Sequence, residues 1–118
     1  EYSFNNIMKI DHFLVTQHRR KKMPAISRIG DLDVPHCSGM VRATGSSDVF
    51  VNTRPAVRQG DINTVHLFPK GDLCPAHVGP VKSGSSSVFI NGLGAGRVGD
   101  GLIKCTSIAQ GSENVFAG

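Results

Sequence analysis

Three residues with metal-binding side chains stand at the same distance from a repeated tetrapeptide. The fifth residue after the aspartate of each tetrapeptide is His36, His66 or Cys105. The tetrapeptide is Arg-x-Gly-Asp, and it occurs at 28–31, 58–61 and 97–100. Imidazole nitrogens and thiolate sulfurs are common zinc ligands in proteins. Equivalent residues of a repeat meet around the axis that relates its copies, so the sequence predicts a metal site.

An insertion in the second copy offers a fourth ligand. The copies start 30 and then 39 residues apart, and we place the nine extra residues between His66 and His77. With His77, three imidazoles and one thiolate would form a closed tetrahedral zinc site. Cys74 stands three residues before His77, which is also ligand spacing, and it is the alternative to His66. Cys37 is a weaker candidate beside His36, and iron would be chemically possible.

Such a site would be structural. Four protein ligands leave no coordination position open for a reactive water, which disfavours a metallohydrolase. No histidine or serine stands beside the repeated arginine and aspartate in the register that a catalytic pair needs. We therefore predict no enzyme activity and no small-molecule substrate. The repeated arginine and aspartate are interpreted as turn-closing residues.

A second repeated signature positions these residues. Gly-Ser-x-x-Val-Phe occurs at 45–50, 84–89 and 111–116, alternating with Arg-x-Gly-Asp along the chain. Each copy leads into a short apolar strand, in which Val49 and Val51 share one face and Phe50 the other. Asn52-Thr53 and Asn91-Gly92 are typical of tight hairpin turns. The sequence thus predicts a series of β-hairpins.

The third hairpin is predicted to use both ends of the repeat region. Return strands follow the turns at 54–58 and 94–98, and residues 23–28 would supply the return strand for 115–117. All 14 glycines and 6 prolines lie from Met23 onward, which favours short strands over helices. We expect an all-β fold in which three hairpin repeats close with approximate threefold symmetry around the metal.

The charge is concentrated in the first 22 residues. Of 13 basic and 9 acidic residues, five basic and two acidic ones lie there, which leaves eight and seven, a net charge of +1, in 23–118. The repeat region therefore has no basic stripe, and nucleic acid is not expected as a partner. We predict two parts: an extension or linker of unknown role at 1–22 and a repeat domain at 23–118.

Three cysteines cannot form a complete set of internal disulfides, so at least one thiol is free or bound to metal. The sequence contains no apolar run of membrane-spanning length. It also has no recognisable secretory signal peptide.

The repeats resemble the PAAR-repeat family. The residues that carry the resemblance are Pro55-Ala56-Val57-Arg58 followed by Gly60-Asp61, the strand Val88 to Gly92, and the opening segment Met23 to Arg28. The resemblance covers 23–118. Val57 replaces the second alanine of the motif, and Gly94-Ala95-Gly96-Arg97 has lost the proline.

This resemblance implies a small cone that caps the trimeric β-helical spike of a contractile injection machine, one chain per trimer. The metal near its point would be zinc, held by His36, His66, His77 and Cys105. The chain looks most like the stand-alone tip of phage tails, located in the virion and used to pierce the bacterial outer membrane. A type VI secretion spike tip is the alternative within the family.

A zinc-stapled adaptor for nucleic acid or protein is the alternative outside the family. It would be favoured if the basic segment 18–22 were needed for binding and salt weakened that binding steeply.

Overall fold

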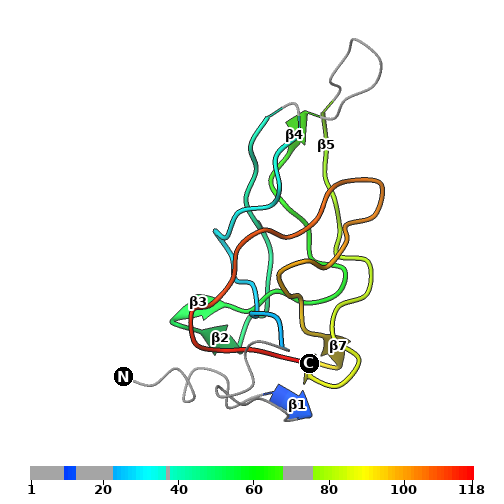
Figure 1. Ribbon diagram of the computed structural model, residues 1–118. Coiled ribbons are helices and arrows are strands. Elements are labelled where there is room, and N and C mark those ends of the chain that lie inside the picture. Colours follow the sequence, from blue (N-terminus) through cyan, green and yellow to red (C-terminus); the bar gives the residue numbers. More distant parts are fainter. Residues whose placement is uncertain (1–9, 13–22, 37, 68–75) are drawn as a thin grey trace.

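Short strands joined by long turns build the molecule, which Figure 1 shows as a computed structural model. The structure describes residues 10–12, 23–36, 38–67 and 76–118, and at 10–12 and 66–67 it describes the course of the backbone. The strands are β1 (Ile10–His12), β2 (Phe50–Val51), β3 (Arg54–Pro55), β4 (His66–Leu67), β5 (Ala76–His77), β6 (Phe89–Ile90) and β7 (Leu93–Gly94). These described ranges contain no helix, and hence none that could cross a membrane. The predicted all-β class is confirmed.

Two of the predicted hairpins are antiparallel strand pairs with tight turns. β2 pairs with β3, and β6 pairs with β7 in the same register. The turn residues have the positive φ angles of such hairpins: 54° and 66° at Asn52 and Thr53, and 55° and 77° at Asn91 and Gly92. Both turns lie where the sequence predicted them.

Thr53 is the strained member of these turns, because a β-branched residue is disfavoured at positive φ. Replacement by glycine, Thr53→Gly, is expected to raise the free energy of unfolding by roughly 0.5–1 kcal/mol. Urea denaturation would measure the change. The converse variant Gly92→Thr, at the equivalent position, should lose a similar amount. Equal stability of all three proteins would contradict this account of the turn.

The third hairpin joins the two ends of the repeat region. Ala25 forms an antiparallel bridge with Phe116. Ile26 N donates to Val115 O at 3.0 Å, and Ala117 N donates to the carbonyl of Pro24 at 3.0 Å. The prediction that 23–28 supplies the return strand for 115–117 is therefore confirmed.

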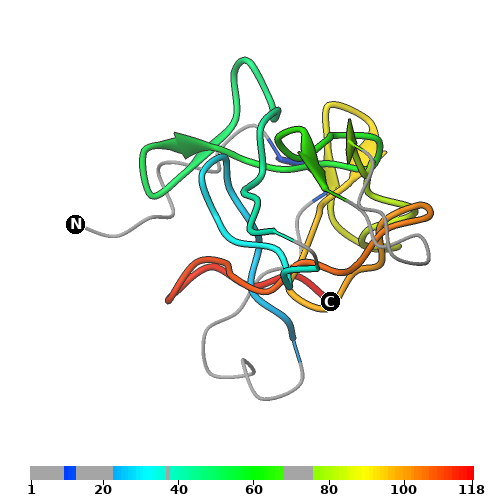
Figure 2. The same cartoon turned by 90° about the horizontal axis from the view of Figure 1, so that it is seen from above.

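A closed ring of backbone hydrogen bonds joins the three hairpins. Ser27 N donates to Gly96 O at 2.9 Å, Gly96 N to Val57 O at 2.8 Å, and Val57 N to Ser27 O at 3.0 Å. These three residues precede the three repeated arginines, so each repeat makes the same bond to its neighbour. The view from above in Figure 2 shows the three repeats arranged around this centre. One chain thus has approximate threefold symmetry.

The hydrophobic core follows the same symmetry. Its larger cluster contains three residues from each hairpin: Ile26, Val115 and Ala117; Val49, Val51 and Ala56; Val88, Ile90 and Ala95. Val49 and Val51 are 1% and 0% exposed while Phe50 is 37% exposed, which confirms the predicted alternation of faces. A smaller cluster of Val57, Val81, Leu102 and Ile108 lies against Cys105. The core therefore extends from the hairpins toward the predicted metal ligands.

The repeated arginine and aspartate close a turn in every copy. In the first copy, Asp31 N donates to Arg28 O at 3.0 Å, and Gly30 has a φ of 91° that glycine adopts without strain. The carboxylate accepts from both Nε and NH2 of the arginine, at 2.8 and 3.0 Å. The pairs Arg58–Asp61 and Arg97–Asp100 repeat this geometry. These residues are structural, as predicted.

The hydrogen bond between the side chains of Arg58 and Asp61 also affects the ionisation of Arg58. It raises the pKa of Arg58 above its usual range, with burial opposing the shift and the charge of Asp61 adding to it. The shift favours the charged form of the Arg58 guanidinium.

Val57 and Gly96, which both depart from the Pro-Ala-Ala-Arg pattern at its second alanine, are in contact. A Cβ added to Gly96 would lie 2.6 Å from Cγ1 of Val57. Gly96→Ala should therefore destabilise the protein by about 1–3 kcal/mol through overpacking.

A second substitution should relieve that clash. The single variant Val57→Ala should cost about 2 kcal/mol through the cavity it leaves. In the double variant the two losses should not add, with a favourable coupling of about 1 kcal/mol or more. A double-mutant cycle in urea would measure this coupling, and strict additivity would show that the two departures are independent.

β1 adds a third strand to the second hairpin. It pairs antiparallel with β6, with Ile10 opposite Ile90 and His12 opposite Phe89. Figure 1 shows β1 near the C-terminus, at the end of the molecule that carries the β2–β3 and β6–β7 hairpins, which we call the base. The proposed boundary between 1–22 and 23–118 stays a prediction. The pairing of β1 with β6 is a backbone contact between these two parts.

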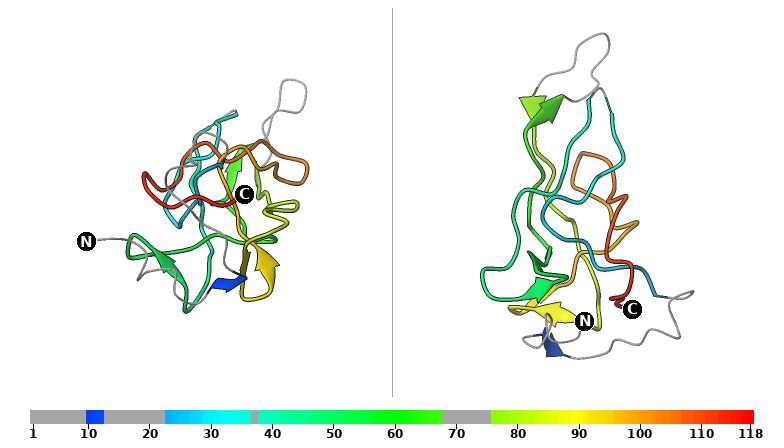
Figure 3. Two further views of the ribbon diagram at one scale, coloured as in Figure 1. Left: turned by 60° about the horizontal axis from the view of Figure 1, so that its bottom comes forward. Right: turned by 90° about the vertical axis from the view of Figure 1, so that its left-hand side faces the viewer.

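The molecule is elongated, with principal extents of 45, 28 and 25 Å. Figure 1 and the right-hand panel of Figure 3 show the β2–β3 and β6–β7 hairpins at one end and β4 and β5 at the other. β4 and β5 pair antiparallel, with His66 opposite His77. The predicted metal ligands are thus carried at the end away from the hairpin base.

Candidate metal centre

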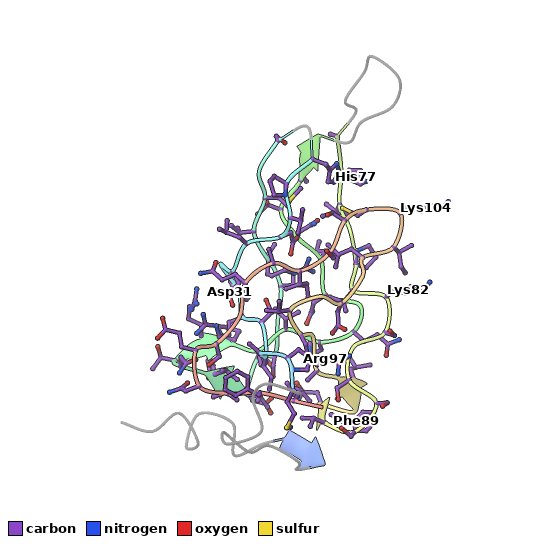
Figure 4. The ribbon with its side chains drawn as sticks, viewed as in Figure 1. Asp31, His77, Lys82, Phe89, Arg97 and Lys104 are labelled. Atoms are coloured by element: carbon purple, nitrogen blue, oxygen red, sulfur yellow. The ribbon has the colours of Figure 1, made fainter. Side chains whose placement is uncertain are left out.

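Three of the four predicted ligands lie in direct contact. Nε2 of His36 is 3.2 Å from Sγ of Cys105 and 3.5 Å from Nε2 of His77, and the sulfur is 3.5 Å from Nε2 of His77. The imidazole rings meet edge to face, with centroids 5.2 Å apart. All three side chains are partly buried. Figure 4 shows His77, the last residue of β5, at the end of the molecule away from the β6–β7 hairpin.

The triangle has the dimensions of a tetrahedral zinc site. Zinc bonds of about 2.0 Å to nitrogen and 2.3 Å to sulfur separate two nitrogens by about 3.3 Å and a nitrogen from a sulfur by about 3.5 Å. The three measured separations lie within a few tenths of an ångström of these values. The donor set is also one that zinc prefers. The residues therefore fit a zinc ion.

Three different segments bring these ligands together. Val34 N donates to Ser107 O at 2.9 Å, which ties the segment before His36 to the one after Cys105. Cys105 follows a tight turn in which its N donates to Leu102 O at 3.2 Å. Gly79 allows close approach there, because a Cβ on it would lie 2.8 Å from the cysteine sulfur.

His66 occupies the register position opposite His77 in the β4–β5 pair. Residues that face each other in an antiparallel pair have Cβ atoms about 5 Å apart on one side of the ladder. The backbone thus brings the fourth predicted ligand beside the third, and its role as a ligand stays a prediction. Cys74 and Cys37, the other candidates from the sequence, lie outside the described residues.

Sequence reasoning missed a buried polar group next to Cys105. It consists of Asp33, Arg42 and Asn63, which are 2%, 0% and 1% exposed. Asp33 Oδ2 accepts from NH1 of Arg42 and from Nδ2 of Asn63, both at 2.9 Å. Nδ2 of Asn63 also lies 3.8 Å from Sγ of Cys105.

A register count could have found this polar group. Asp33, Asn63 and Leu102 each stand two residues after a repeated aspartate. Arg42, Val81 and Ile108 each stand three residues before a repeated Gly-Ser. Arg42 thus stands where the other two copies have apolar residues, and Asp33 where the third copy has Leu102, a departure that the repeats make visible.

The fold and the site together define a β-hairpin protein with internal threefold symmetry and a cluster of metal-ligand side chains. The family model of the PAAR motif matches residues 70–118. The match confirms the resemblance that the repeats indicated. The ring of hydrogen bonds joins Ser27 and Val57, which precede the matched residues, to Gly96, which lies among them. A comparison with curated proteins found no match.

Proposed function

We propose that this protein is the structural tip that caps the trimeric β-helical spike of a contractile injection machine, at the tail of a phage virion. The PAAR motif supports a structural role at the spike tip of such machines. The proposal adds that the chain is not an enzyme, that it binds one copy per trimer, and that it sharpens the spike for piercing the bacterial outer membrane. A type VI secretion spike is the alternative setting.

The observation that carries the proposal is the closed ring of Ser27, Val57 and Gly96. A trimer ends in three equivalent edges, and a single asymmetric cap would leave two of them unmatched. A chain with three near-equivalent hairpins offers one matching surface to each edge. The internal symmetry therefore supports a threefold symmetric partner.

The base also carries side-chain contacts that repeat between hairpins. Oγ of Ser46 donates to Oδ1 of Asn91 at 2.6 Å, and Oγ of Ser112 donates to Oδ1 of Asn52 at 2.6 Å. Ser85 makes the third such bond, to the carbonyl of Gly118, which stands at the position equivalent to the two asparagines. These contacts tie each hairpin to the next and keep the base rigid, as docking on a symmetric partner requires.

The pairing of β1 with β6 supports β-augmentation as the mode of docking. The edge of β6 accepts an antiparallel strand from within the chain. A strand from a spike could add to the other hairpin edges by the same backbone bonds.

The metal would make the end that carries β4 and β5 rigid. In this proposal one zinc ion per chain is held by His36, His66, His77 and Cys105, and it supplies crosslinking and no reactive water. The measured triangle of three donor atoms supports the site, and the register of β4 and β5 supports the fourth ligand.

The test is the stoichiometry of binding to a purified trimeric β-helical spike protein from the same source. Native mass spectrometry of a mixture with excess full chain should give one chain per trimer. Phe50→Asp, which places a charge on an exposed residue of the base hairpin, should weaken the complex, while Ile103→Asp, which charges an exposed residue elsewhere, should not. Three chains per trimer, or no complex, would refute the proposal.

A further inference from the structure

The buried ion pair of Asp33 and Arg42 has no counterpart in the other two repeats, whose equivalent residues are Asn63 with Val81 and Leu102 with Ile108. Val81 and Ile108 are equivalent to Arg42, and their backbones accept the same bond: Gly60 N donates to Val81 O and Gly99 N to Ile108 O, at 2.9 and 2.8 Å. A fully buried ion pair often stabilises a protein no better than apolar residues of similar volume would. Stability alone therefore gives no reason for charge at this position.

The hydrogen bonds of Asn63 define how its amide is oriented. Its Oδ1 accepts from Gly79 N at 2.7 Å, and a backbone N–H can only donate. Its amide nitrogen must therefore point the other way, toward Oδ2 of Asp33 at 2.9 Å and Sγ of Cys105 at 3.8 Å. The N–H groups of Asn63 are divided between a carboxylate and the sulfur.

Arg42 completes the chain of contacts. It donates through NH1 to Asp33 at 2.9 Å and through NH2 to the carbonyl of Asp61 at 2.6 Å. The guanidinium holds the carboxylate, the carboxylate holds the amide, and the amide faces the sulfur. All three side chains are buried, so water does not compete with these bonds.

We infer that Asn63, held by Asp33 and Arg42, is a positioning residue that orients the sulfur of Cys105 for metal binding. This inference rests on the proposed metal site. A contact from a neighbouring side chain that is itself held in place fixes the direction in which a ligand presents its donor atom to a metal. Outer partners of this kind change metal affinity by about 10- to 100-fold when they are removed.

The test compares the full chain with the variant Asn63→Leu, which carries the residue found at the equivalent position Leu102. Zinc affinity is measured by competition with a chromophoric chelator. Cobalt(II) is then substituted for zinc, and the thiolate-to-cobalt charge-transfer band reports directly on the cysteine. We expect Asn63→Leu to bind zinc about 10- to 100-fold more weakly and to shift this band.

Two further variants separate orientation from stability. The triple variant Asp33→Leu, Arg42→Met, Asn63→Leu makes the whole group apolar without leaving a charge unpaired, so it should fold and still bind zinc more weakly. Asn52→Gly removes an asparagine network at the base, replacing it with the residue of the equivalent position Gly118, and should leave zinc affinity and the cobalt band unchanged.

Zinc affinity and a cobalt band equal to those of the unchanged protein, in both the single variant Asn63→Leu and the triple variant, would overturn the inference and leave the metal site standing. An unchanged protein that binds neither zinc nor cobalt would overturn the metal site itself, and the inference with it.

Discussion

Cys105→Ser is expected to lose its zinc and to lower the free energy of unfolding by several kcal/mol. Structural zinc contributes apparent binding free energies on the order of 10 kcal/mol, comparable to the whole stability of a small domain. Serine is a poor zinc ligand, so the imidazole nitrogens of His36 and His77, 3.5 Å apart, would be left without the sulfur that the proposed zinc site needs. Native mass spectrometry for bound metal and urea denaturation would measure both effects.

The matched control is Ser107→Ala, two residues away on the same segment, which should retain one zinc per chain. Adding a chelator to the unchanged protein should reproduce the loss of stability, and Cys105→Ser should not respond to the chelator further. A Cys105→Ser protein that keeps its zinc and its stability would show that the sulfur is not a ligand.

Asp33→Leu should destabilise the protein by about 3–5 kcal/mol, because it leaves the guanidinium of Arg42 buried without its carboxylate. Both side chains of this ion pair are fully buried, and their 2.9 Å contact has no competition from solvent. The loss is expected at any metal concentration, unlike that of Cys105→Ser. Urea denaturation with and without zinc would distinguish the two.

The double variant Asp33→Leu, Arg42→Met serves as the control. Removal of both charges should recover most of the lost stability, since the equivalent positions Leu102 and Ile108 are apolar in a folded repeat. A double variant as unstable as Asp33→Leu alone would show that the loss comes from poor packing of leucine and not from an unpaired charge.

The fold could be predicted from the sequence because three repeats each indicate the same strand and the same turn. Each Gly-Ser-x-x-Val-Phe gave a strand whose valines face the core, and each Arg-x-Gly-Asp gave the same turn. Asn91-Gly92 alone would indicate one hairpin. Its alignment with Asn52-Thr53 identified a repeated unit, and so predicted a third hairpin from segments as distant as 25 and 116.

The grouping of His36, His77 and Cys105 could also be predicted, since two of these residues share a register and the third lies at the end of an insertion. The register of the repeats marks Asp33 and Arg42 as unusual, but residue types alone did not indicate the supporting group of Asp33, Arg42 and Asn63. Nothing local indicates that an arginine is buried, because that depends on packing between repeats. The pairing of β1 with β6 was equally unpredictable, since the apolar pattern near residue 10 fitted a helix or a strand.

The third hairpin differs from the others in how its strands are connected. Turns at 52–53 and 91–92 link the strands of the first two, whereas Pro24 and Ala117 are held together by hydrogen bonds between distant parts of the chain. Under a shearing force at the base, the strands of the first two hairpins stay tethered by their turns even when their hydrogen bonds break, while the strands of the third have no such turn between them. We therefore expect the molecule, when it is pulled, to come apart first between the strands that contain Pro24 and Ala117. A linker that joined these two strands should raise the force needed to separate them without changing the shape of the base.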